Sequence, residues 1–364
     1  MTSLPIVNIR TSDRIAFKRC RRKWGFSSHL RLNRTEDQAR APLWSGTGFH
    51  FAMEDFHGHN RFGDPRKAFM AYVAATQATP LKRVPEDLAE QIELVHGMID
   101  YYLDWLSTRD HLKTFVYEGK PQVEVNFQIP IPLDPAYVEA CGYSQVMYSG
   151  TIDRVVEDEY GRLWVLDYKT AKSFVTSHLD TDPQIGAYLW AGSVLYPGRP
   201  FAGFVYQQHL KKLVEPPKYL SSRRMFSTAK TQATTHKAYS KALKNLYGDI
   251  KAAKPAEIEY LNFLATEESP DMDAMIRRDW EFRNETQISA EGAKILMEAA
   301  DMINPELPMY PNPTRDCAFD CSFKMSCIMM DDGSDWEGDL LTSTIARDDK
   351  NDNWRKYLIW PNNP

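Results

Sequence analysis

Residues 151–169 constrain the fold of this 364-residue chain more than any other stretch, because they predict a β-hairpin together with its register. Two largely apolar runs flank a break at 159–161, where Gly161 supplies the left-handed conformation that ends a three-residue loop. With this loop Asp158 pairs with Arg162, so the numbers of paired residues sum to 320. A shorter or longer loop would turn one strand over, so the register depends on Gly161.

The predicted register brings charged side chains together in an apolar strand. Asp153 lies opposite Asp167, with Cβ atoms ~5 Å apart, and Lys169 projects from the same face. Because 163–166 are apolar, we interpret this strand as buried, where two facing carboxylates are costly to ionise without a cation between them. Mg²⁺ or Mn²⁺ suits such oxygen ligands. The alternative is a solvent-facing edge with an Asp–Lys cross-strand pair.

Two further helical patterns could add groups to such a metal site. His50, Glu54 and His57 share a face of one predicted helix, and we favour His50 as a ligand with Glu54 second. A solvated helical surface is the alternative for this face. Gln184 and Tyr188, one turn apart on a later helix, could hydrogen-bond a phosphate or a base; a capping glutamine and a core tyrosine are the alternative.

The hydrophobic periodicity predicts alternating helices and strands. A helical stripe begins near Pro85 and continues to Leu106, and a second helix over 183–195 has Asp182 as its N-cap and Pro183 at its first position. Residues 216–310 read as helix and loop, which we interpret as an elaboration of one domain. The predicted strands are 122–131, 146–157, 162–169 and 201–209.

The charge of the chain is unevenly distributed, although the whole sequence carries a net charge of −5. Residues 1–40 hold ten Lys/Arg against three acidic residues, and 205–255 hold eleven against two, with aromatic residues between them. Such stretches suit a nucleic-acid backbone and its bases, whereas a solvated helical face is an equal alternative for 237–254. The acidic tail from 331 would repel DNA or simply be solvated. The basic residues expected to contact DNA are Arg21, Arg22 and Lys23.

The five cysteines and the hydropathy pattern bear on the cellular compartment. Five cysteines are too few for a disulfide scaffold of this size, and they are clustered: Cys317, Cys321 and Cys327 lie in one short stretch, Cys20 lies near the other end, and Cys141 stands alone. No apolar run is long enough for a membrane span, and the N-terminal residues lack the apolar core of a signal peptide. We therefore expect a cytoplasmic protein without a membrane partner.

The motifs, taken in order, resemble the PD-(D/E)XK nuclease superfamily, specifically its RecB-like branch with the iron–sulfur exonucleases and CRISPR-adaptation nucleases. The resemblance implies an α/β fold: a mixed central sheet flanked by helices, like that of restriction endonucleases, with helical elaborations. It spans residues 10–330 and is carried by Gly46-x-x-x-His50, Gly150-x-Ile152-Asp153-Arg154, Val165-Leu166-Asp167-Tyr168-Lys169-Thr170, Gln184-x-x-x-Tyr188 and the cysteines.

The same resemblance implies roles for individual residues. The catalytic residues would be Asp153, Asp167 and Lys169, with Lys169 activating water and stabilising the charged transition state. Gln184 and Tyr188 would contact DNA near the scissile phosphate. The implied metal ligands are His50, Asp153, Asp167 and the backbone carbonyl of Tyr168.

The spacing Cys317-x3-Cys321-x5-Cys327, with distant Cys20, resembles the four-cysteine iron–sulfur clamp of those nucleases. Four thiolates suit a 4Fe-4S cluster or zinc, and the absence of Cys-x-x-Cys pairs favours the cluster, with zinc as the alternative. Such a clamp would tie the basic N-terminal region to the C-terminal region. Cys141 is left as a structural residue.

The sequence predicts five regions: a basic N-terminal segment (1–40), a nuclease core (41–215), a helical elaboration (216–310), a cysteine-rich segment (311–330) and an acidic tail (331–364). We expect an Mg²⁺- or Mn²⁺-dependent exonuclease that acts on single-stranded DNA or DNA ends in recombination, repair or phage DNA processing, with a helicase or recombination protein as a candidate partner. A CRISPR-adaptation-type trimming nuclease and a non-catalytic DNA-binding iron–sulfur scaffold are the alternatives.

Overall fold

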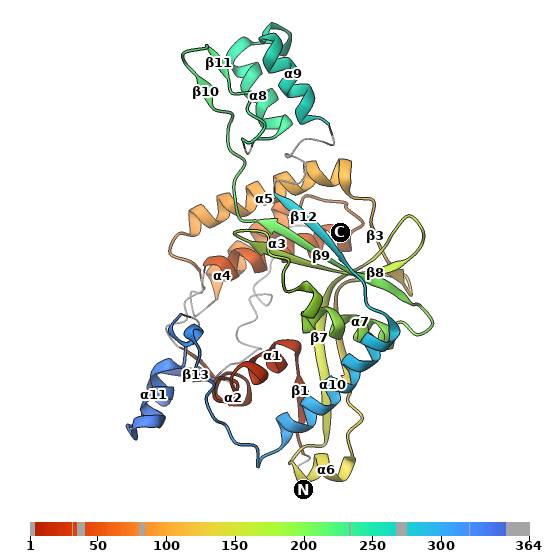
Figure 1. The fold of residues 1–364 in the computed structure, drawn as a ribbon, viewed down its shortest axis with the longest axis vertical. Coiled ribbons are helices and arrows are strands. Elements are labelled where there is room, and N and C mark those ends of the chain that lie inside the picture. Colours follow the sequence, from red (N-terminus) through yellow and green to blue (C-terminus); the bar gives the residue numbers. More distant parts are fainter. Residues whose placement is uncertain are drawn as a thin grey trace.

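The centre of the computed structural model, which describes residues 4–30, 32–34, 41–79, 84–232, 234–266, 275–319 and 321–346, is a seven-stranded sheet (Figure 1). Its strands run both parallel and antiparallel, with β1 parallel to β7 and β9 parallel to β8. This mixed sheet between helices confirms the predicted fold class. In spatial order the strands are β1 (Ile6–Ile9), β7 (Gln145–Glu157), β8 (Leu163–Ala171), β9 (Phe201–Leu210) and β12 (Ile276–Glu281), while β3 (Lys113–Thr114) and β6 (Val123–Pro130) also pair with β7.

The hairpin β7–β8 has the register predicted from its turn. Arg154 pairs with Leu166 and Glu157 with Leu163, so the paired numbers sum to 320. Gly161 has a φ of 77°, a conformation that glycine adopts without the strain a Cβ would cause. Beyond the Arg154–Leu166 pair the two strands separate, and the next residues on each strand are available for other contacts.

Alternate residues of β8 face two different layers of helices. Trp164, Leu166 and Tyr168 join a buried cluster with α3 (Ala41–Gly58), α4 (Pro65–Ala78) and α5 (Leu88–Arg109). Leu163 and Val165 join the other cluster, with α7 (Pro183–Leu195) and α10 (Glu285–Ile303). Helix α7 begins as predicted, because the Asp182 side chain accepts a hydrogen bond from the Gln184 amide and Pro183 occupies the first turn.

The region expected as one helical elaboration, 216–310, is divided in the structure. Its first part forms a small lobe with a core of its own. Its second part returns to the sheet as β12 and then packs α10 against α7, so it belongs to the core. The lobe comprises β10 (Tyr219–Leu220), β11 (Met225–Phe226), α8 (His236–Tyr247), η3 (Ile250–Ala252) and α9 (Pro255–Leu264).

Elements near the start of the chain lie beside elements that follow residue 320, with α2 (Arg21–Trp24) next to α11 (Lys324–Asp332) and β13 (Thr344–Ala346) (Figure 1). Arg22 on α2 forms an ion pair of 2.6 Å with Asp331 on α11. Beyond Ala346 the expected acidic tail lies outside the described residues. The remaining elements here are α1 (Thr11–Arg19), η1 (Gly25–His29), η5 (Arg315–Ala318), α12 (Trp336–Ser343) and β2 (Leu32–Arg34), which pairs with β13.

Three short elements connect the core strands: β4 (Val116–Tyr117), β5 (Lys120–Pro121) and α6 (Pro135–Ala140). A further short helix, η2 (Leu179–Thr181), precedes α7. Within the described part of the chain, no helix has the length and apolar character needed to cross a membrane.

Candidate active site

Three side chains from different elements converge where β7 and β8 separate. His50 on α3, Glu124 on β6 and Asp153 on β7 each offer a ligand atom, and these atoms all lie within 4.8 Å of one another. The His50 Nδ1 lies 3.3 Å from the Asp153 Oδ2. All three are partly buried, so an imidazole and two carboxylates are held close together with solvent access. This donor set fits a divalent cation.

Glu124 was not predicted from the sequence as a site residue. Its neighbours Val123 and Val125 pair with Arg154 and Ile152, so the register places Glu124 opposite Asp153. Its φ of 47° marks a local irregularity of β6 at this point. The polar alternate positions of the predicted strand 122–131 were the available signal, but that pattern does not specify the register against β7.

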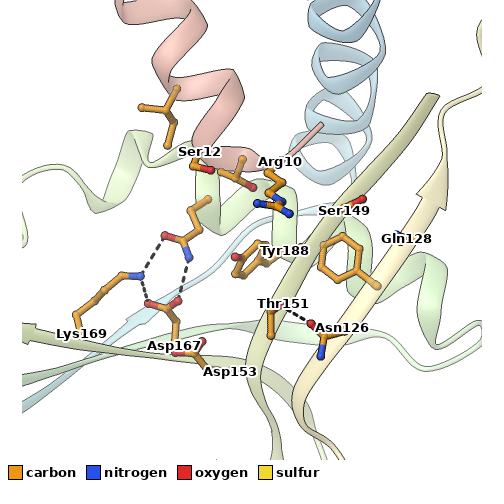
Figure 2. A pocket seen from close by; sticks show the side chains of 15 residues that line it. Arg10, Ser12, Asn126, Gln128, Ser149, Thr151, Asp153, Asp167, Lys169 and Tyr188 are labelled. Atoms are coloured by element: carbon orange, nitrogen blue, oxygen red, sulfur yellow. Dashed lines mark hydrogen bonds and ion pairs between the residues drawn. The ribbon is translucent and has the colours of Figure 1, made fainter. Parts of the chain in front are cut away.

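Asp167 and Lys169 lie together beside Asp153 (Figure 2), and Gln184 hydrogen-bonds to both, so that the three form a second group. The Lys169 Nζ lies 2.7 Å from the Asp167 Oδ2. The Gln184 amide joins both partners: its nitrogen donates to the Asp167 Oδ1 at 2.9 Å, and its oxygen accepts from the Lys169 Nζ at 3.2 Å. Gln184 therefore orients the carboxylate and the ammonium relative to each other.

The electrostatics of this pair follow from burial. Burial raises the pKa of Asp167 to about 6; Lys169 opposes this shift and Asp153 adds to it. Burial disfavours the charge on Lys169, but Asp167 and Asp153 outweigh it and hold the pKa of the ammonium above its ordinary value. Lys169 therefore stays protonated, as a fixed positive charge beside the carboxylates.

Two hollows meet over these residues, because Asp153 and Lys169 line both. The larger, about 890 Å³, is lined mostly by neutral polar side chains. The smaller, about 620 Å³, contains His50 and Glu124. Around the larger hollow in Figure 2 lie Arg10, Ser12, Asn126, Gln128, Ser149, Thr151 and Tyr188.

A model of the PD-(D/E)XK nuclease superfamily matches residues 12–328, which is most of the chain. The chain belongs to this superfamily. A search of curated proteins finds no match. The matched range contains every residue of the two groups described above. Superfamily members are metal-dependent nucleases, so the substrate class of this PD-(D/E)XK nuclease is nucleic acid.

The residues of α3 predicted to share one face lie in two different surroundings: His50 lies at the nuclease site and His57 lies in the core. His50 points to Asp153, whereas His57 is fully buried and its Nε2 lies 2.7 Å from the Tyr102 hydroxyl. Burial, and then the neighbouring Arg154, hold the pKa of His57 well below its usual value, so it is neutral. The carboxylate that joins His50 is Glu124 rather than Glu54.

The predicted DNA contacts of the nuclease fall in two places. Gln184 and Tyr188 line the larger hollow. Arg22 instead contacts the C-terminal segment through Asp331, and the Arg21 guanidinium lies over the rings of Phe17 and Tyr310. Lys23 belongs to the same short helix, α2.

The predicted backbone ligand, the carbonyl of Tyr168, lies on the residue that anchors Asp153. The Tyr168 amide donates to the Asp153 Oδ2 at 2.8 Å. The Tyr168 ring is buried on the other side of the strand, where its hydroxyl accepts from the Arg154 guanidinium at 3.2 Å. These contacts hold the backbone of Tyr168 beside the ligand group.

The four candidate cluster cysteines lie where the two ends of the nuclease meet. Cys20 caps α2, and the Cys327 Sγ accepts from Arg22 at 3.3 Å. Burial raises the pKa of the Cys321 thiol; Lys23 opposes this, and Cys317 and Cys20 add to it. Among the described residues, the cysteine sulfurs do not form a group of three or more within 4.8 Å of one another.

Proposed function

We propose that this protein is an Mg²⁺- or Mn²⁺-dependent deoxyribonuclease that degrades DNA from an end, with single-stranded DNA as the preferred substrate. The observation that carries the proposal is the meeting of two groups where two hollows adjoin: the His50–Glu124–Asp153 ligand set, which lines the smaller hollow, and the Asp167–Lys169 pair, which lines the larger. A phosphodiester placed there would have divalent-cation ligands on one side and a fixed ammonium on the other.

The ligand set provides the place for a divalent cation. His50, Glu124, Asp153 and Asp167, with the Tyr168 carbonyl, would hold it. A bound ion of this kind lowers the pKa of a bound water and stabilises negative charge on a phosphate. Glu124 extends the set expected from the family resemblance.

Lys169 performs the second part of the chemistry. Its ammonium is held by Asp167 and Gln184 at the edge of the hollow. There it would orient the attacking water and stabilise charge that develops on the phosphoryl oxygens. Because Gln184 contacts both partners, we propose it as the residue that positions them, beside its predicted contact with DNA.

The larger hollow supports action on unpaired nucleotides. Its neutral polar lining, including Asn126, Gln128 and Thr151, suits hydrogen bonds to bases and sugars, and Tyr188 could stack on a base. In a duplex the bases are paired and stacked, so their faces are not free to stack on Tyr188 until the strands separate. We therefore propose a cytoplasmic role in recombination, repair or phage DNA processing, with unwound strands supplied by a helicase or recombination partner.

Two alternatives share some of these features. A CRISPR-adaptation-type trimming nuclease would use the same groups and differ in the DNA ends that it accepts. A non-catalytic scaffold would not require Asp167 buried against Lys169 in the centre of the sheet, and this pair therefore favours an enzyme.

The test compares wild type with Lys169→Ala on end-labelled and circular single-stranded DNA in Mg²⁺ or Mn²⁺. We expect wild type to degrade linear strands and spare circles, and Lys169→Ala to lose about 10²- to 10³-fold in kcat. Lys120→Ala, an exposed lysine on β5, is the matched control. Cleavage of circles would indicate an endonuclease, and equal rates for wild type and Lys169→Ala would contradict the assigned site.

We also propose that Cys20, Cys317, Cys321 and Cys327 hold a 4Fe-4S cluster, with zinc as the second candidate. The contacts between the N-terminal and C-terminal segments support this, because they bring all four cysteines into one region. Anaerobically purified wild type should be coloured and contain about four irons per chain. Cys321→Ala should be colourless, while Cys141→Ala, the matched control, keeps the colour. If purified wild type contains zinc and no iron, the cluster is refuted and the four cysteines form a zinc site instead.

A further inference from the structure

Residues 216–265 form a lobe that projects from the nuclease core on the side of α5 (Figure 1). It has its own buried cluster, which includes Tyr239, Leu243 and Tyr260. Its internal anchor is Glu257, a fully buried carboxylate that accepts hydrogen bonds from the Phe226 amide at 2.7 Å and from a tyrosine hydroxyl. The buried cluster and Glu257 therefore hold the lobe together from within.

The surface of the lobe is strongly basic. Residues 216–265 contain nine Lys/Arg and three Asp/Glu, and one of those acids is the buried Glu257. The positive charge is therefore concentrated in one part of a chain whose net charge is −5. Within the described residues, Lys237 alone among the nine basic side chains forms an ion pair, while Lys230 lies over the Phe263 ring and Lys254 donates to the Arg223 carbonyl. The other six are exposed: Lys218, Arg223, Arg224, Lys241, Lys244 and Lys251.

An exposed aromatic ring accompanies these charges on the β10–β11 hairpin. Tyr219 is 43% exposed, and its ring packs edge-on against Phe226 at 5.5 Å, which holds it in place. Lys218 precedes it in the chain, and Arg223 lies in the turn of the same hairpin. A fixed aromatic ring beside cations is the arrangement that stacks an unpaired base and neutralises its phosphates.

The lobe is connected to the active site by cationic residues. Strand β9 ends at Leu210, and the next residue, Lys211, lines the smaller hollow with His50 and Lys169. Exposed Lys212 follows and forms an ion pair of 2.7 Å with Glu215, directly before the chain enters the lobe. On the other side, Lys237 of the lobe contacts Asp104 of α5 at 3.2 Å.

We propose that the 216–265 lobe is a binding site for single-stranded nucleic acid, which holds the substrate strand beyond the nucleotide that lies in the active site. The proposal extends the proposed nuclease function. Lys211 continues the positive charge from the lobe to the hollow. Unpaired bases would stack on Tyr219, and phosphates would contact the exposed lysines and arginines.

The experiment measures binding of a fluorescent single-stranded DNA without Mg²⁺ and in EDTA, by anisotropy at several salt concentrations. The variant Lys218→Ala/Arg223→Ala/Lys241→Ala/Lys244→Ala removes four exposed cations of the lobe. If each cation contacts one phosphate, the plot of log K for binding against log salt concentration should become less steep by about 2.8, because one phosphate contact on a single strand contributes about 0.7 to the steepness. Tyr219→Ala should weaken binding of single strands more than of duplex.

The control variant Lys67→Ala/Lys120→Ala removes two exposed lysines of the core and should leave the slope unchanged. Thermal unfolding of all variants checks the fold. An unchanged slope in the lobe variant, or equal loss of duplex binding in Tyr219→Ala, would overturn the proposal. Binding is measured without cleavage, so the two proposals can fail separately. If the lobe variant binds DNA more weakly but the wild-type protein cuts no DNA, the proposed nuclease activity is refuted and the proposed binding role of the lobe stands.

Discussion

Acid should destabilise this protein through two histidines that the fold holds neutral. His57 and His209 are fully buried. Burial is the main cause that lowers the pKa of both histidines. The nearby Arg154 lowers the pKa of His57 further, and His50 lowers that of His209 further. Below pH 6.5 the unfolded chain binds protons that these side chains cannot bind when folded, so the free energy of unfolding falls as the pH falls.

The magnitude follows from the ordinary histidine pKa. When the pH falls from 7.5 to 5.0, each histidine that stays neutral in the folded state should lower the free energy of unfolding by roughly 2 kcal/mol, and the pair by roughly 4 kcal/mol. In His57→Gln the side chain no longer titrates and can still accept from Tyr102. Its loss of stability between the two pH values should therefore be smaller than in wild type by about 2 kcal/mol.

The assay is urea unfolding, followed by tryptophan fluorescence in EDTA, at pH 7.5 and 5.0. All other groups, including Asp167 with its pKa of about 6, contribute equally to wild type and variant and drop out of the difference. His59→Gln, at an exposed site, should behave as wild type. Equal acid sensitivity in wild type and His57→Gln would refute the burial argument.

Three further changes test the turn, the ligand set and the cationic path. Gly161→Ala places a Cβ at φ 77° and should cost about 1 to 2 kcal/mol in thermal unfolding, whereas Gly58→Ala, in helical backbone with open space around it, should not destabilise. Glu124→Gln should weaken Mn²⁺ binding in calorimetric titration at least about tenfold, because losing even a residue that only hydrogen-bonds to a metal ligand costs about that much. Glu118→Gln, at an exposed site, should leave Mn²⁺ binding unchanged. Burial, with Lys172, lowers the pKa of Lys211 to about 8, so DNA binding should weaken as the pH rises through 8 in wild type but not in Lys211→Met, as measured by anisotropy.

Local turn chemistry explains what could be predicted from the sequence. Gly161 determines the loop length, and the loop length determines which residues of β7 and β8 face each other. Glu124 could not be found in this way, because 131–144, which include α6, connect β6 and β7 and leave their register open. The alternating polar residues of β6 were visible, but not the strand position that they face.

Strand β12 shows a second limit of sequence patterns. Four of its six residues are charged, and the edge strand accommodates them because these groups find partners: Arg277 pairs with Asp279 and Arg278 with Asp110. Its partner β9 is apolar over most of its length and was predicted. The pairing of the two strands joins segments far apart in the sequence, and short-range periodicity carries no information about it.

The charges gathered at the site give a reason for a divalent rather than a monovalent cation. Glu124, Asp153 and Asp167 bring three carboxylates to adjacent strands, and Lys169 is the ammonium paired with one of them. With the carboxylates ionised and His50 neutral as a ligand, the set carries an excess of two negative charges. One Mg²⁺ or Mn²⁺ would balance that excess, whereas a monovalent ion would leave a net negative charge facing the phosphates of the substrate. Loss of Glu124 would reduce the excess to one, and the site should then discriminate less strongly in favour of divalent ions.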